Sequence, residues 1–338
     1  MPGTEPLPRL AAALVARAHL VDAAHETAFR LFNGHLEGDP RWVIDAYGRT
    51  AVVYRHGEPD DAGLAALLDA LRARLSWLET IVVKEREGLY EARRGRVAFR
   101  APGSGGPDAQ VAEHGVRYAV DPLLNQDAGF YLDTRELRRW LLDHAEGKTV
   151  LNTFAYTGSL GVAALAGGAT RVLQTDLNPR FLDVARASTA LNGLPVDARD
   201  FVARDFFSFV RGAKLRGDRF DVAILDPPFF SSTPRGELDL SRDTTRLVNK
   251  VRPLVRGGGA LVVVNNALFL SGAAFLAELE ALCAGGWVTI EDLIDVPPDV
   301  TGYAETRFGE PPVDPAPFPH STKIAVLGVR HRQAPAAT

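Results

Sequence analysis

Apolar and polar positions form two distinct patterns along this 338-residue chain. Longer stretches have a helical period, such as the one that begins at Asn178-Pro179 and stops at Gly193. Shorter apolar runs have the length and composition of buried strands. In the second half of the chain these runs occur at residues 149–153, 171–175, 200–203, 220–225, 260–264, 287–290 and 322–328. Strands that alternate with helices predict a doubly wound α/β sheet.

The first third of the chain has a different pattern. Helical periodicity predicts helices at residues 8–24 and 61–77. Shorter runs predict strands at residues 28–32, 42–45, 51–54, 80–83, 90–100 and 117–121. We therefore expect an N-terminal helical segment over residues 1–27, a small α/β domain over residues 28–120, and a larger domain over residues 121–338.

Two segments of the larger domain need separate interpretation. The uncharged run 257–277 is long enough to cross a bilayer, but its glycines and asparagines divide it into a strand, a polar loop and a helix. We therefore expect no membrane contact. The proline-rich segment 297–319 is too long for a simple connector. It either wraps the surface or forms a lid over the substrate.

Bulk composition limits the possible functions. A net charge of -4 gives no overall attraction to nucleic acid, so any RNA contact needs a local basic patch. The chain has one cysteine, which excludes a disulfide framework and a cysteine zinc site and favours a reducing cytoplasm. Arg17 and His19 interrupt the early apolar run, so we expect no signal peptide. The histidines lack metal-ligand spacing, and we expect no metal.

The turn after the strand at 149–153 carries the first chemical signal. Gly158 and Gly161 let the backbone approach a ligand at the N-terminus of the following helix. The turn lacks the third glycine of a dinucleotide fingerprint, and the chain has no triphosphate-binding loop. Asp176 ends the next strand, where a carboxylate can accept both hydroxyls of a ribose. Asp205 follows the third strand, so the pattern predicts an adenosine-containing cofactor.

A second signal, Asp226-Pro-Pro-Phe229, follows the strand at 220–225. Ligands of open α/β sheets bind at the carboxyl ends of strands, so this segment should lie near the cofactor. Asp226 and the Pro227 carbonyl can accept hydrogens from an amino group, while Phe229 stacks on a flat ring. The order of these signals resembles class I S-adenosylmethionine-dependent methyltransferases.

A narrower resemblance rests on longer motifs. Residues 126–135, the turn 152–158 and Asp226-Pro-Pro-Phe229 are similar to bacterial large-subunit (23S) ribosomal RNA methyltransferases, a group with cytosine-C5 and guanine-N7 enzymes. Residues 29–34, 43–48 and 114–121 resemble the small domain of that group. The similarity covers roughly residues 28–330. The residues before this similarity leave no room for the N-terminal RNA-binding module that is usual in the cytosine enzymes, so we expect the chain to lack it.

This resemblance implies a Rossmann-like seven-stranded methyltransferase sheet, a smaller N-terminal α/β domain, and S-adenosyl-L-methionine as cofactor. The predicted cofactor-binding residues are Tyr131, Arg135, Asn152, Phe154, Tyr156, Thr157, Gly158, Asp176, Leu177, Asp205, Phe206 and Asp226. The predicted catalytic residues are Asp226, Pro227, Phe229, Asn265 and Asn266.

The modified atom follows from a missing nucleophile. Carbon 5 of cytosine needs a thiolate that adds transiently to the ring. The cytosine enzymes have that cysteine where this chain has Val264-Asn265-Asn266, and Cys283 is expected to pack in a helix. The guanine-N7 members carry a similar Asn-Asn pair. A purine nitrogen, preferably of guanine, is therefore favoured over cytosine C5, and an exocyclic amino group is the other acceptor that suits these residues.

A basic stretch in the small domain is the expected substrate contact. Its residues are Lys84, Arg86, Arg93, Arg94 and Arg96. They either follow RNA phosphates or form a solvated strand face. The sequence thus predicts an RNA base methyltransferase acting on ribosomal RNA. The alternatives are a small-molecule methyltransferase whose N-terminal domain caps the pocket, and a non-catalytic RNA-binding relative.

Overall fold

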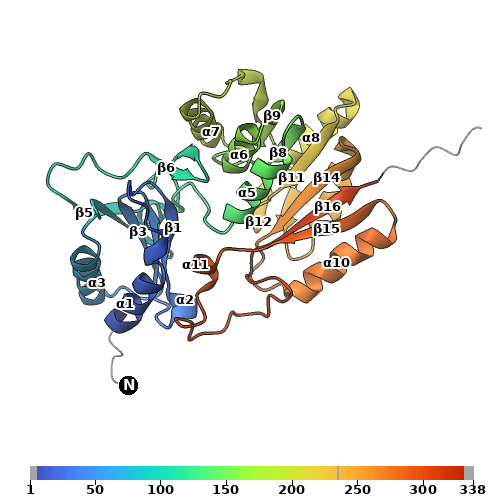
Figure 1. Cartoon of the computed structure of the whole chain (residues 1–338). Coiled ribbons are helices and arrows are strands. Elements are labelled where there is room, and N and C mark those ends of the chain that lie inside the picture. Colours follow the sequence, from blue (N-terminus) through green and yellow to red (C-terminus); the bar gives the residue numbers. More distant parts are fainter. Residues whose placement is uncertain (1–5, 234–235, 331–338) are drawn as a thin grey trace, which may run out of the picture. The chain divides into compact units, whose positions relative to one another are not determined.

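The computed structural model describes residues 6–233 and 236–330 (Figure 1). The chain forms two compact units. The first contains the residues up to Asp133 together with Pro297–Glu310, and the second contains Thr134–Val296 together with the chain from Pro311 onward. Residues 121–133 thus group with the first unit, although the sequence suggested a boundary after residue 120.

The second unit contains the expected seven-stranded sheet, in the order β10-β9-β8-β11-β14-β16-β15. The strands from β10 to β14 run parallel, and β16 runs antiparallel to both of its neighbours. The seven strands are β8 (Thr149–Thr153), β9 (Arg171–Asp176), β10 (Phe201–Ala203), β11 (Phe220–Leu225), β14 (Val255–Asn265), β15 (Val288–Ile294) and β16 (Lys323–Val329). This order confirms the Rossmann-like fold class.

Helices cover both faces of this sheet (Figure 1). On one face, α5 (Arg135–His144) and α6 (Ser159–Ala166) pack over Val150 and Ile224. On the other, α8 (Phe206–Arg216), α9 (Thr244–Val251) and α10 (Gly272–Ala284) pack over Leu151 and Leu225. Adjacent strand residues thus face opposite layers, which explains why the parallel strands read as continuous apolar runs.

Local signals begin several of these helices where the sequence indicated. Helix α7 (Pro179–Leu191) follows Asn178, whose side chain accepts from the Arg180 N–H. The uncharged run divides as expected, because β14 ends at Asn265 and Ser271 caps α10. In the described part of the chain, every helix is too short or too polar to cross a membrane.

The first unit contains a five-stranded sheet in the order β1-β2-β3-β4-β5. Helices α1 (Pro6–Ala16) and α3 (Asp61–Arg74) form one core with it. Its strands are β1 (Ala28–Asn33), β2 (Trp42–Tyr47), β3 (Thr50–Arg55), β4 (Thr80–Glu85) and β5 (Arg96–Arg100). The smaller elements of the chain are η1 (Ala18–Leu20), α2 (Gly34–Glu37), β6 (Gln110–Glu113), β7 (Val116–Ala119), η2 (Ala198–Asp200), β12 (Phe230–Thr233), β13 (Gly236–Asp239) and η3 (Arg252–Leu254).

The strand predicted at residues 90–100 is wrong over its first half. Tyr90–Arg94 forms the short helix α4, and the strand begins only at Arg96. Gly95 separates them with a φ of 93°, and a Cβ there would lie 2.8 Å from the Val83 carbonyl oxygen. The close approach of two backbones thus requires glycine and turns the chain.

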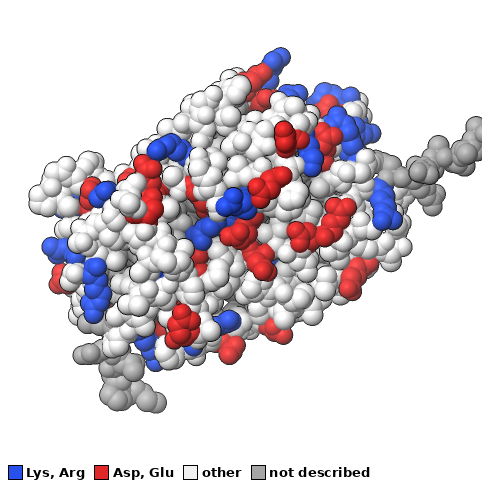
Figure 2. All heavy atoms as spheres, in the orientation of Figure 1, with Lys and Arg blue, Asp and Glu red and all other residues white. Residues whose placement is uncertain are grey.

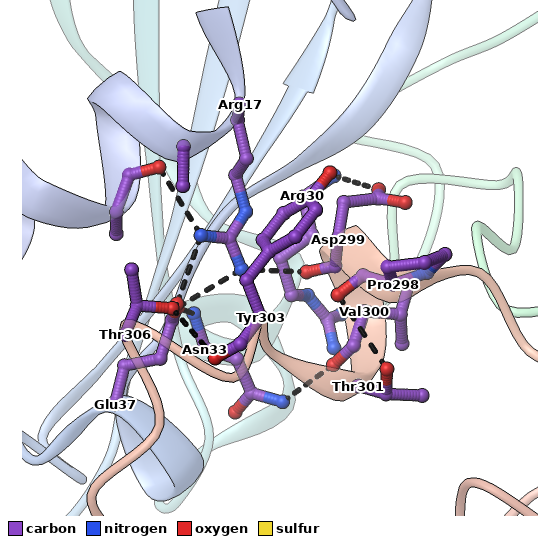
Figure 3. Close-up of polar contacts among 12 residues, drawn as sticks. Arg17, Arg30, Asn33, Glu37, Pro298, Asp299, Val300, Thr301, Tyr303 and Thr306 are labelled. Atoms are coloured by element: carbon purple, nitrogen blue, oxygen red, sulfur yellow. Dashed lines mark hydrogen bonds and ion pairs between the residues drawn. The ribbon is translucent and has the colours of Figure 1, made fainter.

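The proline-rich segment is divided between the units, and its first part is anchored within the first unit (Figure 3). Arg17 forms a bidentate ion pair with Glu37 at 2.8 and 3.0 Å, and also donates to the Asp299 carbonyl next to α11 (Pro298–Thr301). Asn33 donates to the Val300 carbonyl at 2.8 Å. These buried bonds favour the wrapping alternative over a lid for this part of the segment.

Candidate active site

The turn between β8 and α6 has an unusual backbone conformation. Phe154 and Tyr156 have positive φ angles of 53° and 51°, and Gly158 follows at 78°. Non-glycine residues are uncommon in this region, and each costs of order 1 kcal/mol or more. Main-chain bonds hold the turn, including Ala155 N–H to the Thr175 carbonyl at 2.9 Å. The turn thus has a fixed, strained shape at the carboxyl end of β8.

Both glycines of this turn allow close packing beneath it. A Cβ on Gly158 would lie 2.4 Å from the Ala185 Cβ, and one on Gly161 would lie 2.4 Å from Gln174 Oε1. Any larger residue would push α6 away from β9 and α7. The glycines therefore bring the N-terminus of α6 close to the strand ends, which leaves its N–H groups directed at this edge of the sheet.

Buried amides lie under the turn. Asn152 and Gln174 occupy paired positions on β8 and β9, and Asn152 Nδ2 donates to Gln174 Oε1 at 3.3 Å. Within residues 6–233 and 236–330, Asn152 Oδ1, Gln174 Nε2 and Thr175 Oγ1 are buried without a hydrogen-bond partner. Such groups are uncommon in folded proteins, and a bound ligand or an ordered water can supply the missing partners.

Asp176 links the turn to the end of β9. Its Oδ2 accepts from the Tyr156 N–H and its Oδ1 from the Asn178 N–H, both at 2.9 Å. Burial raises the pKa of this carboxyl group, and the N–H donors of Asn178 and Tyr156 act in the opposite direction. Each carboxylate oxygen has capacity for a second donor. The neighbouring Leu177 is 62% exposed, so a carboxylate and an apolar surface lie together here.

Asp205 and Phe206 form the next part of this edge. Asp205 Oδ1 caps α8 by accepting from the Ser208 N–H at 3.0 Å. Phe206 is 6% exposed, and its ring stacks on Phe154 with centroids 4.6 Å apart. The Phe206 ring therefore supports the turn from the core, and the expected contact of this residue with the cofactor stays a prediction.

Asp226-Pro-Pro-Phe229 follows β11, the immediate neighbour of β8. Thr153 Oγ1 donates to the Ile224 carbonyl at 2.6 Å, which joins the ends of these two strands. Pro227 is buried and restricts the backbone of the segment. Phe229 is 45% exposed, so part of this residue is accessible to a ligand.

Asn265 supports this segment and does not extend into the site. It is fully buried, and its Nδ2 donates to the Leu240 carbonyl and to Thr244 Oγ1, both at 3.1 Å. Its Oδ1 accepts from the Ala267 N–H. Because both amide hydrogens are used, the predicted base contact by Asn265 is revised to a positioning role. Leu240 in turn donates its N–H to the Phe229 carbonyl at 3.0 Å.

Asn266 and Lys323 differ sharply in exposure. Asn266 is exposed at the end of β14. Lys323, paired with Asn265 across β14 and β16, is fully buried and donates to the Ala267 and Leu270 carbonyls at 3.0 and 3.1 Å. Burial lowers the pKa of Lys323 to about 8. Lys323 was not among the residues expected at the site, although a charged side chain at the start of an apolar strand was an available signal.

The basic stretch lies in the first unit and is largely bonded internally. Lys84 is fully buried and donates to the carbonyls of Asn125, at 2.7 Å, and Arg94. It is therefore a structural residue and not the phosphate contact that was expected. Three of the four arginines, Arg86, Arg93 and Arg94, each donate a hydrogen bond to a residue in the segment 123–126. The fourth, Arg96, is exposed. Their remaining N–H groups can still meet an anion.

The remaining residues that were predicted to bind the cofactor are Tyr131, Arg135 and Thr157. Tyr131 belongs to the first unit, where its hydroxyl donates to Asp127 Oδ2 at 2.7 Å. Arg135 is the first residue of α5, and Thr157 is buried within the turn. Their contacts with a cofactor stay predictions. Cys283 packs against the core beside Leu279, as expected.

Comparisons with known proteins agree with this geometry. The family model of the S-adenosylmethionine-dependent methyltransferases matches residues 96–307. Ribosomal RNA large subunit methyltransferase I from Photobacterium profundum is 32% identical over 272 residues, which are 77% of this chain and 68% of that protein. The enzyme of the same name from Aeromonas hydrophila is 32% identical over 293 residues, or 85% and 73% of the two chains.

A solved structure agrees at the level of the fold. The crystal structure of SMU.776 in complex with S-adenosylhomocysteine (SAH) covers 96% of this chain and 80% of its own, with a TM-score of 0.80 and 24% identity. The strained turn, the glycines beneath it and the carboxylate of Asp176 suit an adenosyl cofactor. This chain belongs to the S-adenosylmethionine-dependent methyltransferase family and is an enzyme that uses S-adenosylmethionine as its methyl donor.

Proposed function

We propose that this enzyme methylates a base of large-subunit ribosomal RNA, and that the acceptor is a purine nitrogen, guanine by preference. The named activity of the relatives from Photobacterium profundum and Aeromonas hydrophila supports the RNA class. The observation that carries the choice of a base as the acceptor is the exposed Phe229, which directly follows the Asp226-Pro-Pro segment at the end of β11.

The cofactor side of the site uses three strand ends. Asp176 accepts the ribose hydroxyls with the second lone pair of each oxygen, and Leu177 packs against the adenine. Asp205 accepts from the adenine amino group while it caps α8. The turn from Asn152 to Gly158 holds the methionine part near the α6 N-terminus. Bound there, S-adenosylmethionine supplies an electrophilic methyl group.

The acceptor side orients a base and holds its protons. Phe229 stacks on the base, and the Pro227 carbonyl and the Asp226 carboxylate accept hydrogens from its amino group. A ring nitrogen with a lone pair then needs only alignment with the methyl group. Carbon 5 of cytosine would need a thiolate, and Cys283, the single cysteine, packs in the α10 layer instead.

The two asparagines have separate roles in this proposal. Asn265 donates to the Leu240 carbonyl, and the Leu240 N–H donates to the Phe229 carbonyl. Asn265 therefore positions Phe229 for stacking. Asn266 is exposed and offers its amide to the edge of the base. RNA phosphates contact four arginines of the first unit, Arg86, Arg93, Arg94 and Arg96. The proposal also includes the cytoplasmic location expected from the single cysteine.

The test is methyl transfer in vitro to large-subunit ribosomal RNA that lacks this modification, followed by mass spectrometry of the nucleosides. We expect one methylated guanine, which disappears with Asp226→Ala. A product of 5-methylcytosine or of methylated ribose would contradict the base assignment. Transfer to small molecules with none to RNA would instead support the alternative in which the first unit caps a compact pocket.

A further inference from the structure

A groove of about 560 Å³ lies on the second unit beside α8. Its lining contains none of the residues that are proposed to bind the cofactor or the base. Its lining residues are Thr149, Arg171, Leu173, Arg199, Val202, Arg204, Phe209, Arg216, Asp218, Arg219, Phe220 and Arg256. Six of these twelve residues are arginines, an unusual concentration in a chain whose net charge is -4.

The groove passes along the side of the sheet. Arg171 and Phe220 begin β9 and β11, so one end of the groove lies at the amino ends of the strands. Arg204 follows β10 and its N–H donates to the Asp176 carbonyl at 2.8 Å, so the other end lies at the carboxyl edge that holds Asp176. The groove therefore connects the edge of the cofactor site with the opposite edge.

Four of the six arginines form ion pairs with carboxylates. These pairs are Arg171–Asp200 at 2.6 Å, Arg199–Asp197 at 2.6 Å, Arg216–Asp218 at 2.7 Å and Arg256–Asp221 at 2.8 Å. Across the described part of the chain, no carboxylate lies within ion-pair distance of Arg204 or Arg219, and both are exposed. The groove therefore has excess positive charge at these two positions.

Figure 2 shows Lys and Arg side chains gathered, with acidic side chains between them, over the part of the second unit where α8 ends. The floor beneath the arginines is apolar but almost inaccessible, because Leu173, Phe209 and Phe220 are 8%, 2% and 7% exposed. A base would need an exposed aromatic face to stack on. The floor offers none, so the guanidinium groups are the recognition elements.

We propose that this groove binds the phosphate backbone of the RNA substrate, with Arg204 and Arg219 as its principal contacts. The inference rests on the proposed function, because it takes RNA as the substrate. Arginine presents a planar fork of donors that matches phosphate oxygens. The four paired arginines can exchange a carboxylate for a phosphate at little cost, because exposed ion pairs are weak. The groove thus places RNA contacts on the catalytic unit itself.

The experiment compares the double variant Arg204→Gln/Arg219→Gln with a matched double variant on the same unit. The control is Arg211→Gln/Lys214→Gln, which removes two exposed positive charges from α8 outside the groove. RNA binding is titrated at several salt concentrations with a large-subunit ribosomal RNA fragment. Methyl transfer and S-adenosylmethionine binding are measured in parallel, and Arg204→Lys/Arg219→Lys restores the charge.

Loss of two phosphate contacts should reduce the slope of log affinity against log salt by about 1.4 for single strands or about 1.8 for a duplex. We expect the groove variant to raise KM for RNA at least about fivefold, with kcat at saturating RNA and cofactor affinity unchanged. The control should match the wild type, and the lysine variant should recover most of the slope.

The outcomes separate the groove from the proposed function. If the wild type methylates RNA and the groove variant keeps the wild-type KM and salt slope, the groove inference is wrong and the proposed function stands. If the wild type transfers no methyl group to RNA, the proposed function fails, but a loss of salt-dependent RNA binding in the groove variant still supports the groove. Preferential loss of poly-glutamate binding, with RNA binding intact, would assign the groove to an acidic protein and overturn the inference.

Discussion

At the scale of single residues, the site depends on side chains that combine a structural bond with a free lone pair or ring face. Asp176 holds the Tyr156 and Asn178 N–H groups and still has acceptor capacity. Phe229 accepts a hydrogen bond through its carbonyl, and the residue is 45% exposed. Such residues are oriented before a ligand arrives, which is how a binding site keeps its geometry.

Asp176→Ala should weaken S-adenosylmethionine binding. The carboxylate accepts charge-assisted hydrogen bonds worth about 1.5–3 kcal/mol, which corresponds to roughly 10- to 150-fold in affinity. Calorimetric titration measures it, and thermal unfolding shows whether the turn at Tyr156 has loosened. Asp183→Ala, which removes an exposed α7 carboxylate paired with Arg186, is the matched control. Unchanged affinity in Asp176→Ala would exclude the ribose role.

Phe229→Ala should slow methyl transfer while cofactor affinity changes little. Base–aromatic stacking contributes about 1–3 kcal/mol, which predicts a loss of roughly 5- to 150-fold in kcat/KM. Phe229→Tyr keeps the ring and should retain most of the activity. The exposed neighbour Phe230 provides a control, because its removal should have a smaller effect. Equal losses from both alanine variants would argue against a specific stacking role.

His56 should make the first unit sensitive to acid. Its ring meets His35 edge-on at 4.7 Å, and burial, His35, Arg86 and Arg30 lower its pKa from 6.5 to about 4. Between pH 6.5 and about 4, His56 is therefore protonated in the unfolded chain and neutral in the folded chain. Stability should fall as pH drops from 6.5 towards 4, and His56→Gln should flatten this decline in denaturant titrations. Parallel curves for both proteins would contradict the assignment.

At the scale of elements, the end of β14 positions the segment that follows β11. Asn265 donates to Leu240 and Thr244, and Leu240 donates to Phe229, so the end of this 11-residue strand fixes the segment between β11 and β12. Lys323 secures the residues after β14 through the Ala267 and Leu270 carbonyls. The exposed part of the site thus rests on a buried polar network.

Asn265→Ala and Asn266→Ala should therefore differ in their effects on stability. Asn265→Ala leaves buried acceptors without donors, so we expect a loss of about 1–3 kcal/mol in unfolding free energy together with a lower kcat. Asn266→Ala should leave stability within about 0.5 kcal/mol of the wild type and change only methyl transfer. Denaturant unfolding and steady-state kinetics measure both. A stable Asn265→Ala protein with normal kcat would refute the positioning role.

At the scale of the whole molecule, the sequence predicted the catalytic fold well because its strands are buried on both faces and read as apolar runs. The positions of Asp176, Asp205 and Asp226 followed, since each ends or follows such a strand. The roles of Asn265 and Lys84 could not be predicted, because both depend on carbonyls far along the chain, at Leu240 and Asn125. The groove depends equally on residues from several elements.

The most direct test of the proposed activity compares modified nucleosides of large-subunit ribosomal RNA from cells with and without this gene, by mass spectrometry. A methylated guanine should be missing without the gene. It should return with the wild-type gene and return incompletely with Phe229→Ala. Loss of 5-methylcytosine instead, or identical nucleoside profiles in both strains, would contradict the proposal that this methyltransferase modifies a guanine of ribosomal RNA.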